Sequence, residues 1–87
     1  MKYVKVTWPK SPKSYRIIEI DFEKVMYQVI MESFADGKVQ NVNEFWQPIV
    51  SQTVKGQIKR WREASPTNSS PFKIEEISRL EMMAYKL

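Results

Sequence analysis

The chain has 87 residues, a formal net charge of +4 and neither histidine nor cysteine. These two absences remove the commonest general base, the commonest metal ligand and the strongest side-chain nucleophile, and with them disulfides and metal sites built from nitrogen or sulfur ligands. With 43% hydrophobic and 28% charged residues, the composition predicts a single globular domain spanning residues 1–87, with a modest core, no cofactor and a reducing, cytoplasmic location.

The first predicted element is a half-buried β-strand over residues 2–8. Its side chains alternate between two faces, which is the period of a strand. One face carries Val4, Val6 and Trp8. Pro9 and Pro12 end this strand, and residues 10–14 are predicted to form a loop.

Residues 15–21 are rich in β-branched side chains and predict a second strand, with Ile18 and Ile20 on one face. Residues 22–34 allow two interpretations. Apolar residues at helical spacing favour a helix, with Asp21 as its N-cap. The pair Asp36-Gly37 favours instead a hairpin turn between a strand over residues 27–34 and another over residues 38–42.

A longer helix is predicted within residues 43–64. Pro48 suits the first position of a helix, because proline lacks the N–H that has no partner there. The helical spacing of Val50, Val54, Ile58 and Trp61 predicts a buried stripe. Gly56 lies in the middle of this helix and weakens it.

The end of the chain carries the clearest local signature. Residues 65–71 predict an exposed loop, and residues 72–75 a short extended segment. Ser78 and Glu81 match a capping box, with Ile77 and Met82 at the spacing of a hydrophobic staple. These residues predict a short terminal helix over residues 79–86.

The order of these segments resembles a family of small uncharacterised bacterial domains of β-rich type. The resemblance rests on the opening strand at residues 1–8, the segment Glu19-Ile20-Asp21, the turn at residues 34–39, and residues 72–78 before a short helix. It covers about half of the chain and implies an architecture, with residues 27–34 as a strand, but no chemistry. The middle of the family is usually acidic and proline-bearing, whereas residues 53–62 here are basic.

Together these elements predict an α+β fold. A small antiparallel sheet of three to four strands packs against one longer helix and one short C-terminal helix. Both helices are expected on one side of the sheet, covering the apolar face that includes Val4, Val6, Trp8, Ile18 and Ile20.

The candidate binding residues fall in two groups. On the predicted longer helix, Lys55, Lys59 and Arg62 share one face, with Arg60 beside them and Trp61 between two arginines. Phosphates bind such cations and an indole can stack on a base, although Trp61 also continues the buried stripe. Phe45 and Trp46 are adjacent and point in different directions, so one of them is a candidate surface anchor, with core packing as the alternative for each.

No residue is predicted to be catalytic and no metal site is predicted. Neighbouring carboxylates such as Glu75 and Glu76 rarely converge across a cleft as an acid–base pair must. Apolar runs of two or three residues predict neither a signal peptide nor a membrane span, so no membrane partner is expected.

The leading hypothesis is a non-enzymatic protein-binding module, an immunity or antitoxin-like protein that blocks a partner protein by covering its active surface. The net positive charge favours a partner with an acidic surface. The alternative hypothesis is a small basic nucleic-acid-binding protein that uses residues 55–62. The sequence leaves the oligomeric state open.

Overall fold

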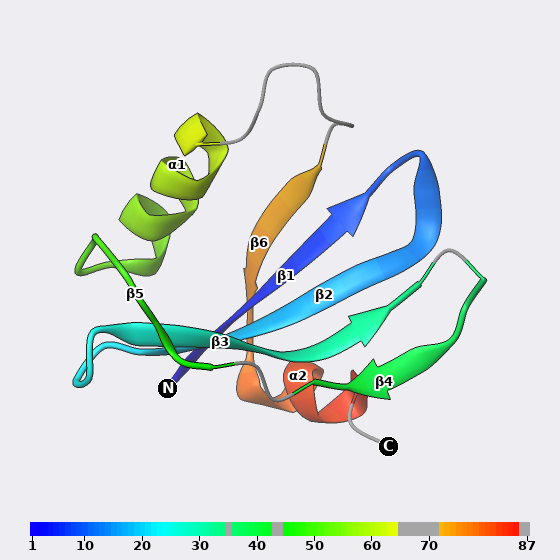
Figure 1. The fold of residues 1–87 in the computed structure, drawn as a ribbon, viewed down its shortest axis with the longest axis horizontal. Helices are drawn as coiled ribbons and strands as arrows, with labels where there is room; N and C mark the ends of the chain where they lie inside the picture. Colours follow the sequence, from blue (N-terminus) through cyan, green and yellow to red (C-terminus); the bar gives the residue numbers. More distant parts are fainter. Residues whose placement is uncertain (35, 43–44, 65–71, 86–87) are drawn as a thin grey trace.

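A computed structural model of the chain describes residues 1–34, 36–42, 45–64 and 72–85. These residues form one antiparallel sheet and two helices (Figure 1). The strands are β1 (Lys2–Trp8), β2 (Ser11–Asp21), β3 (Met26–Ser33), β4 (Val39–Asn41), β5 (Gln47–Pro48) and β6 (Lys73–Ile77), and the helices are α1 (Val54–Ala64) and α2 (Arg79–Tyr85).

The strand order is β4-β3-β2-β1-β6, and β5 pairs with β3 beside β4. The predicted α+β class is therefore correct. The prediction of three to four strands is wrong, since the described residues form a six-stranded sheet. The extra strands are β5, whose two residues are too few to show a period of two, and β6, which extends the short segment predicted over residues 72–75.

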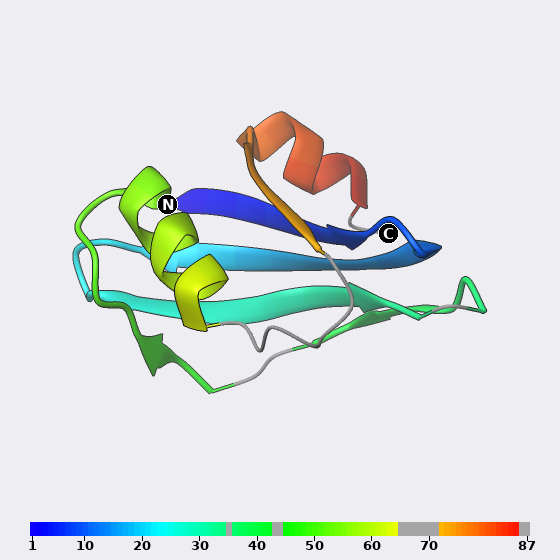
Figure 2. The same ribbon diagram turned by 90° about the horizontal axis from the view of Figure 1, so that it is seen from above.

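The helices lie on opposite sides of the sheet, with the strands between them (Figures 1 and 2). One core joins Val4, Ile18 and Ile20 to Val54 of α1. A second core joins Tyr3 and Ile17 to Met82 of α2, together with Met31 and Ile77. Since adjacent strand residues point to opposite faces, the sheet is covered on both faces, and the prediction that both helices lie on one side is wrong.

The predicted loop at residues 10–14 is also wrong, because β2 already begins at Ser11. Only Pro9 and Lys10 form the turn after β1, and Trp8 pairs with Ser11 across an irregularity in the register. Pro12 is accommodated near the start of β2, at the end of the sheet, where a missing ladder donor costs little.

Residues 22–34 follow the hairpin interpretation. β3 pairs with β2 over its whole length, so the expected strand over residues 27–34 is confirmed and the helix is not formed. Asp21 does not cap a helix; its Oδ1 accepts hydrogen bonds from the N–H groups of Glu23 and Lys24 and closes the β2–β3 turn. The second predicted hairpin is also confirmed, with Gly37 at a φ of 85° between β3 and β4.

The longer helix begins six residues later than predicted, at Val54. Pro48 lies in β5, and Val50 is exposed instead of buried. The cap is Thr53, whose Oγ1 accepts a hydrogen bond from the N–H of Gly56 at 3.0 Å. Gly56 is needed there, because a Cβ at this position would clash with Ser51 Oγ.

The terminal helix is confirmed as α2. Ser78 Oγ accepts a hydrogen bond from the N–H of Glu81 at 3.1 Å, as expected for its cap. Ile77 and Met82 are buried in the same core, as the staple requires. The predicted loop at residues 65–71 lies outside the described residues. Within the described part of the chain, neither helix is long and apolar enough to cross a membrane.

Candidate binding surfaces

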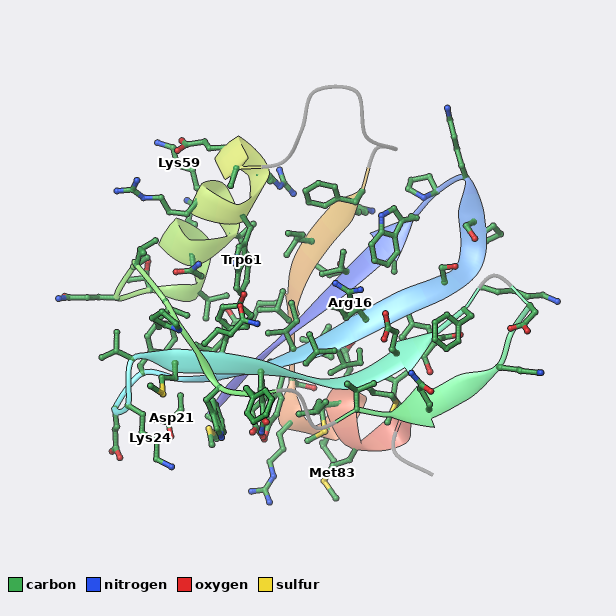
Figure 3. The ribbon with its side chains drawn as sticks, viewed as in Figure 1. Arg16, Asp21, Lys24, Lys59, Trp61 and Met83 are labelled. Atoms are coloured by element: carbon green, nitrogen blue, oxygen red, sulfur yellow. The ribbon has the colours of Figure 1, made fainter. Side chains whose placement is uncertain are left out.

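The structure separates the predicted site residues into two surfaces. Lys55, Lys59, Arg60, Trp61 and Arg62 all lie on α1, whereas Phe45 and Trp46 lie at the start of β5. Figure 3 shows Trp61 directed from α1 toward the strands and Lys59 directed away from them. The basic and the aromatic residues of α1 therefore point in different directions.

The four cations of α1 are exposed, but Trp61 is not free beside them. Trp61 packs against the core that contains Val54, and its indole meets the Tyr27 ring edge-on, with 5.1 Å between the ring centres. The guanidinium of Arg62 donates a hydrogen bond to the backbone carbonyl of Ile74 at 3.4 Å. This placement favours the packing interpretation of Trp61 over base stacking.

A wide-open hollow of about 710 Å³ follows the outer face of α1 and is lined by Lys55, Lys59, Arg62, Glu63 and their neighbours on the same helix. Among the residues that the structure describes, a single helix supplies its walls. It presents three cations and one carboxylate but no aromatic ring. Such a face can attract an anionic surface, yet it offers no stacking platform.

The second surface is apolar, and we call it the β5 edge surface. Its members come from the β2–β3 turn, the start of β3 and the segment around β5: Val25, Met26, Phe45, Trp46, Pro48 and Val50. Phe45 is 92% exposed, Val50 69% and Val25 49%. These are large apolar side chains in water, on two segments that pair directly through Met26 and Pro48.

Three local contacts hold this surface in place. The backbone carbonyl of Val25 accepts a hydrogen bond from the N–H of Ile49 at 3.0 Å, which ties the turn to β5. The ammonium of Lys24 lies 5.6 Å from the ring centre of Trp46, within cation–π range. Pro48 occupies an edge strand, where its missing N–H interrupts no ladder toward the interior.

A buried side chain connects the two surfaces. Gln57 of α1 is 3% exposed, and its Oε1 accepts hydrogen bonds from the N–H groups of Val50 and Ser51, at 3.0 and 3.2 Å. The loop that presents Val50 is therefore fixed by the inner face of the same helix that carries the cations. Figure 1 shows this loop passing from β5 directly into α1.

Val25 has a φ of 57°, in the left-handed region that β-branched residues rarely adopt. Such a conformation costs about 1–3 kcal/mol and persists only where the surrounding structure enforces it. Here the strain is located at the centre of the exposed apolar surface.

Sequence reasoning found only part of the β5 edge surface. Phe45 and Trp46 were candidates, but Val25 and Met26 were assigned to a helical stripe and Val50 to the buried face of α1. The signal that could have placed Val50 outside is the string of caps before the helix, Ser51 and Thr53, which marks a helix start after Pro48.

The titratable groups with displaced pKa values lie on the α2 side of the sheet, away from both surfaces. Burial, helped by the charge of Glu19, raises the pKa of Tyr3, and burial raises the pKa of Tyr15. The pKa of Lys5 is raised because its ammonium donates a hydrogen bond to the Tyr85 hydroxyl at 2.5 Å. Over the described ranges, no three acidic side chains gather in a way that would hold a metal ion.

The described geometry therefore offers two neighbouring faces for a partner, one apolar and one basic. Comparisons of the chain with models of protein families, with curated proteins and with solved structures found no match.

Proposed function

We propose that the chain is a non-enzymatic protein-binding module, of the immunity or antitoxin-like kind, that blocks a partner protein by covering its active surface. The observation that carries the proposal is the β5 edge surface. Phe45 at 92% exposure and Val50 at 69% lie beside Val25 at 49% on paired segments of a rigid sheet. Clustered exposed apolar side chains of this size are typical of interaction sites.

The surface has the composition of an interface centre. Aromatic residues and methionine are enriched there, because they bury much area at little cost in side-chain entropy. Phe45 and Trp46 supply the aromatic groups and Met26 the adaptable one. Phe45 is the anchor, because its ring has the most surface left to lose on contact.

The surrounding charges favour a partner with an acidic rim. Lys24 lies over Trp46, and Lys55 and Lys59 extend from the neighbouring helix α1. Complementary charges raise the rate of association and select among partners. A basic enzyme such as a typical nuclease is therefore a poor match, and an acidic target is a good one.

The alternative function, binding of nucleic acid through residues 55–62, has less support from the geometry. The cations Lys55 and Lys59 are exposed, but Trp61 contacts the core and Tyr27. Without an exposed ring, this segment would bind nucleic acid through charge alone.

The test measures affinity for the partner that the wild-type chain captures from the cells that make it. After that partner is purified, we expect Phe45→Ala to weaken binding at least tenfold, because truncation of a central anchor commonly costs about 2 kcal/mol or more. Val50→Ser should also weaken it, by a smaller factor.

The matched control is Leu80→Ser on α2. Leu80 is 81% exposed, comparable to Phe45, but lies on the opposite side of the sheet. It should leave the affinity unchanged. Loss of binding with Leu80→Ser, and none with Phe45→Ala, would show that a different surface contacts the partner and would refute the proposal.

A further inference from the structure

A second hollow lies where the two hairpins of the sheet end, and it has a different chemistry from the β5 edge surface. It has a volume of about 250 Å³. Its walls combine two aromatic rings, a carboxylate, two hydroxyls and a lysine, supplied by Trp8, Phe34, Glu32, Ser11, Ser14 and Lys10. The volume is below the usual range for drug-sized ligands, so it suits one planar group and not a whole extended molecule.

The side chains of this hollow are held in place by the sheet. Arg16 and Glu32 are directly paired between β2 and β3, and the guanidinium donates a hydrogen bond to the carboxylate at 2.8 Å. The same guanidinium lies 5.9 Å from the ring centre of Trp8. Figure 3 shows Arg16 on β2, beyond the part of the sheet that α1 covers. Trp8, Arg16 and Glu32 thus form a fixed ladder across three strands.

Phe34 stands at the end of β3 and is 44% exposed. Its position is set by the β3–β4 turn, since its N–H donates to the Lys38 carbonyl at 3.0 Å and its carbonyl accepts from the Gly37 N–H at 2.8 Å. A ring fixed by its own backbone and still open to water is a stacking platform.

The charge of the hollow decides which planar group fits. Lys10 and Arg16 outnumber Glu32, and Lys38 follows on the adjacent turn. A cationic side chain from a partner would meet two cations for one carboxylate that is already paired. A planar group that carries a negative charge is favoured by both the rings and the cations.

We infer that this hollow is a binding site for a nucleotide, either free or within a single strand. The base stacks against Phe34 and Trp8, the hydroxyls of Ser11 and Ser14 hydrogen-bond its edge, and the phosphate lies toward Lys10. This site differs from residues 55–62 because it joins exposed rings to cations, which the outer face of α1 does not.

The test is titration of the wild-type chain with adenosine monophosphate and with a labelled single-stranded oligonucleotide of about twelve nucleotides. Binding of both probes identifies a site for free nucleotides, and binding of the oligonucleotide alone identifies a site for a strand. We expect Phe34→Ala to weaken binding about tenfold, the usual effect of removing one stacking ring. Lys10→Glu should weaken it and lower the salt dependence of the oligonucleotide by about 0.7 in the log–log slope per lost phosphate contact.

Phe45→Ala and Lys55→Glu are the matched controls, because they change the same residue types on the other two surfaces. Both should bind the probes as wild type does. Lys10 lies in an exposed turn, so its variant keeps the test decisive if Phe34→Ala weakens the fold.

The inference is overturned if neither probe binds up to about 1 mM, well above the usual dissociation constants for non-specific contacts with nucleic acid. It is also overturned if Phe34→Ala and Lys10→Glu bind normally. Equal binding of polyglutamate with the same dependence on the variants would show recognition of charge alone, and would likewise remove the nucleotide site.

Discussion

Gln57 is the residue whose replacement tests most sharply how the β5–α1 loop is held. Its side chain is 3% exposed, and a single oxygen accepts two backbone hydrogen bonds, from Val50 and Ser51. Replacement by leucine keeps the approximate volume and the helix propensity but removes both acceptors. The two N–H groups are then left without a partner or must turn toward water.

The expected loss follows from these two bonds. A typical hydrogen bond contributes about 1 kcal/mol net, and a buried donor left without a partner costs about 1–3 kcal/mol. The added apolar burial of leucine offsets part of this cost. We therefore expect Gln57→Leu to lower the free energy of unfolding by about 2 kcal/mol, which for a domain of this size lowers Tm by about 8–16 °C.

The assay is equilibrium unfolding in urea, followed by tryptophan fluorescence, with thermal unfolding as a second measurement. Gln52→Leu is the matched control, because Gln52 lies in the same loop and is exposed. It should change stability by less than about 0.5 kcal/mol. If Gln57→Leu is as stable as wild type, the two hydrogen bonds do not hold the loop and the reasoning is refuted.

Two further predictions concern other parts of the fold. Gly56→Ala, which would stabilise an ordinary helix by about 1 kcal/mol, should destabilise this one, because the new Cβ would clash with Ser51 Oγ and lie 2.9 Å from Thr53 Oγ1; Ser51→Ala should recover part of the loss in urea unfolding, and a stabilised single variant would contradict the geometry. Stability should also fall as the pH rises above about 10, because the raised pKa values of Lys5 and the two tyrosines on the α2 side mean that the folded chain holds these protons more tightly than the unfolded chain. The contribution of Lys5 is complete below its unfolded pKa and is lost through its folded pKa, so Lys5→Met, which removes the hydrogen bond to Tyr85, should make the alkaline decline less steep in unfolding measured at several pH values.

The sequence predicted those elements whose own residues decide their conformation. The alternation of residues 2–8 gives β1, and the Ser78 cap with the Ile77 and Met82 staple gives α2. Asp36-Gly37 marks a real hairpin turn. In each case the deciding contacts join residues close together in the chain.

The errors arise where distant contacts override the local pattern. Residues 22–34 have a helical spacing of apolar residues, but pairing with β2 makes the segment a strand that buries Val29 on one face and Met31 on the other, across an irregularity in the register. Two-sided burial of this kind removes the simple period of two from the sequence. Likewise, Val50 continues the helical stripe by spacing, yet pairing of β5 with β3 ends the strand just before it and leaves it exposed.

The candidate site was predictable only in its residue types. Phe45 was visible as an anchor because an aromatic pair cannot bury both rings on one face. Its neighbours in space, Val25 and Met26, lie about twenty positions earlier and come together with it through the β3–β5 pairing. That pairing rests on two strand residues and has no signature in the sequence.

The central claim, that the protein acts by contact through the β5 edge surface, is tested most directly by amide hydrogen exchange of the chain alone and in complex with its purified partner. The account predicts slowed exchange in residues 24–27 and 45–53 on complex formation, with α2 (residues 79–85) unchanged. Protection confined to α2, with exchange around β5 unaffected, would contradict it.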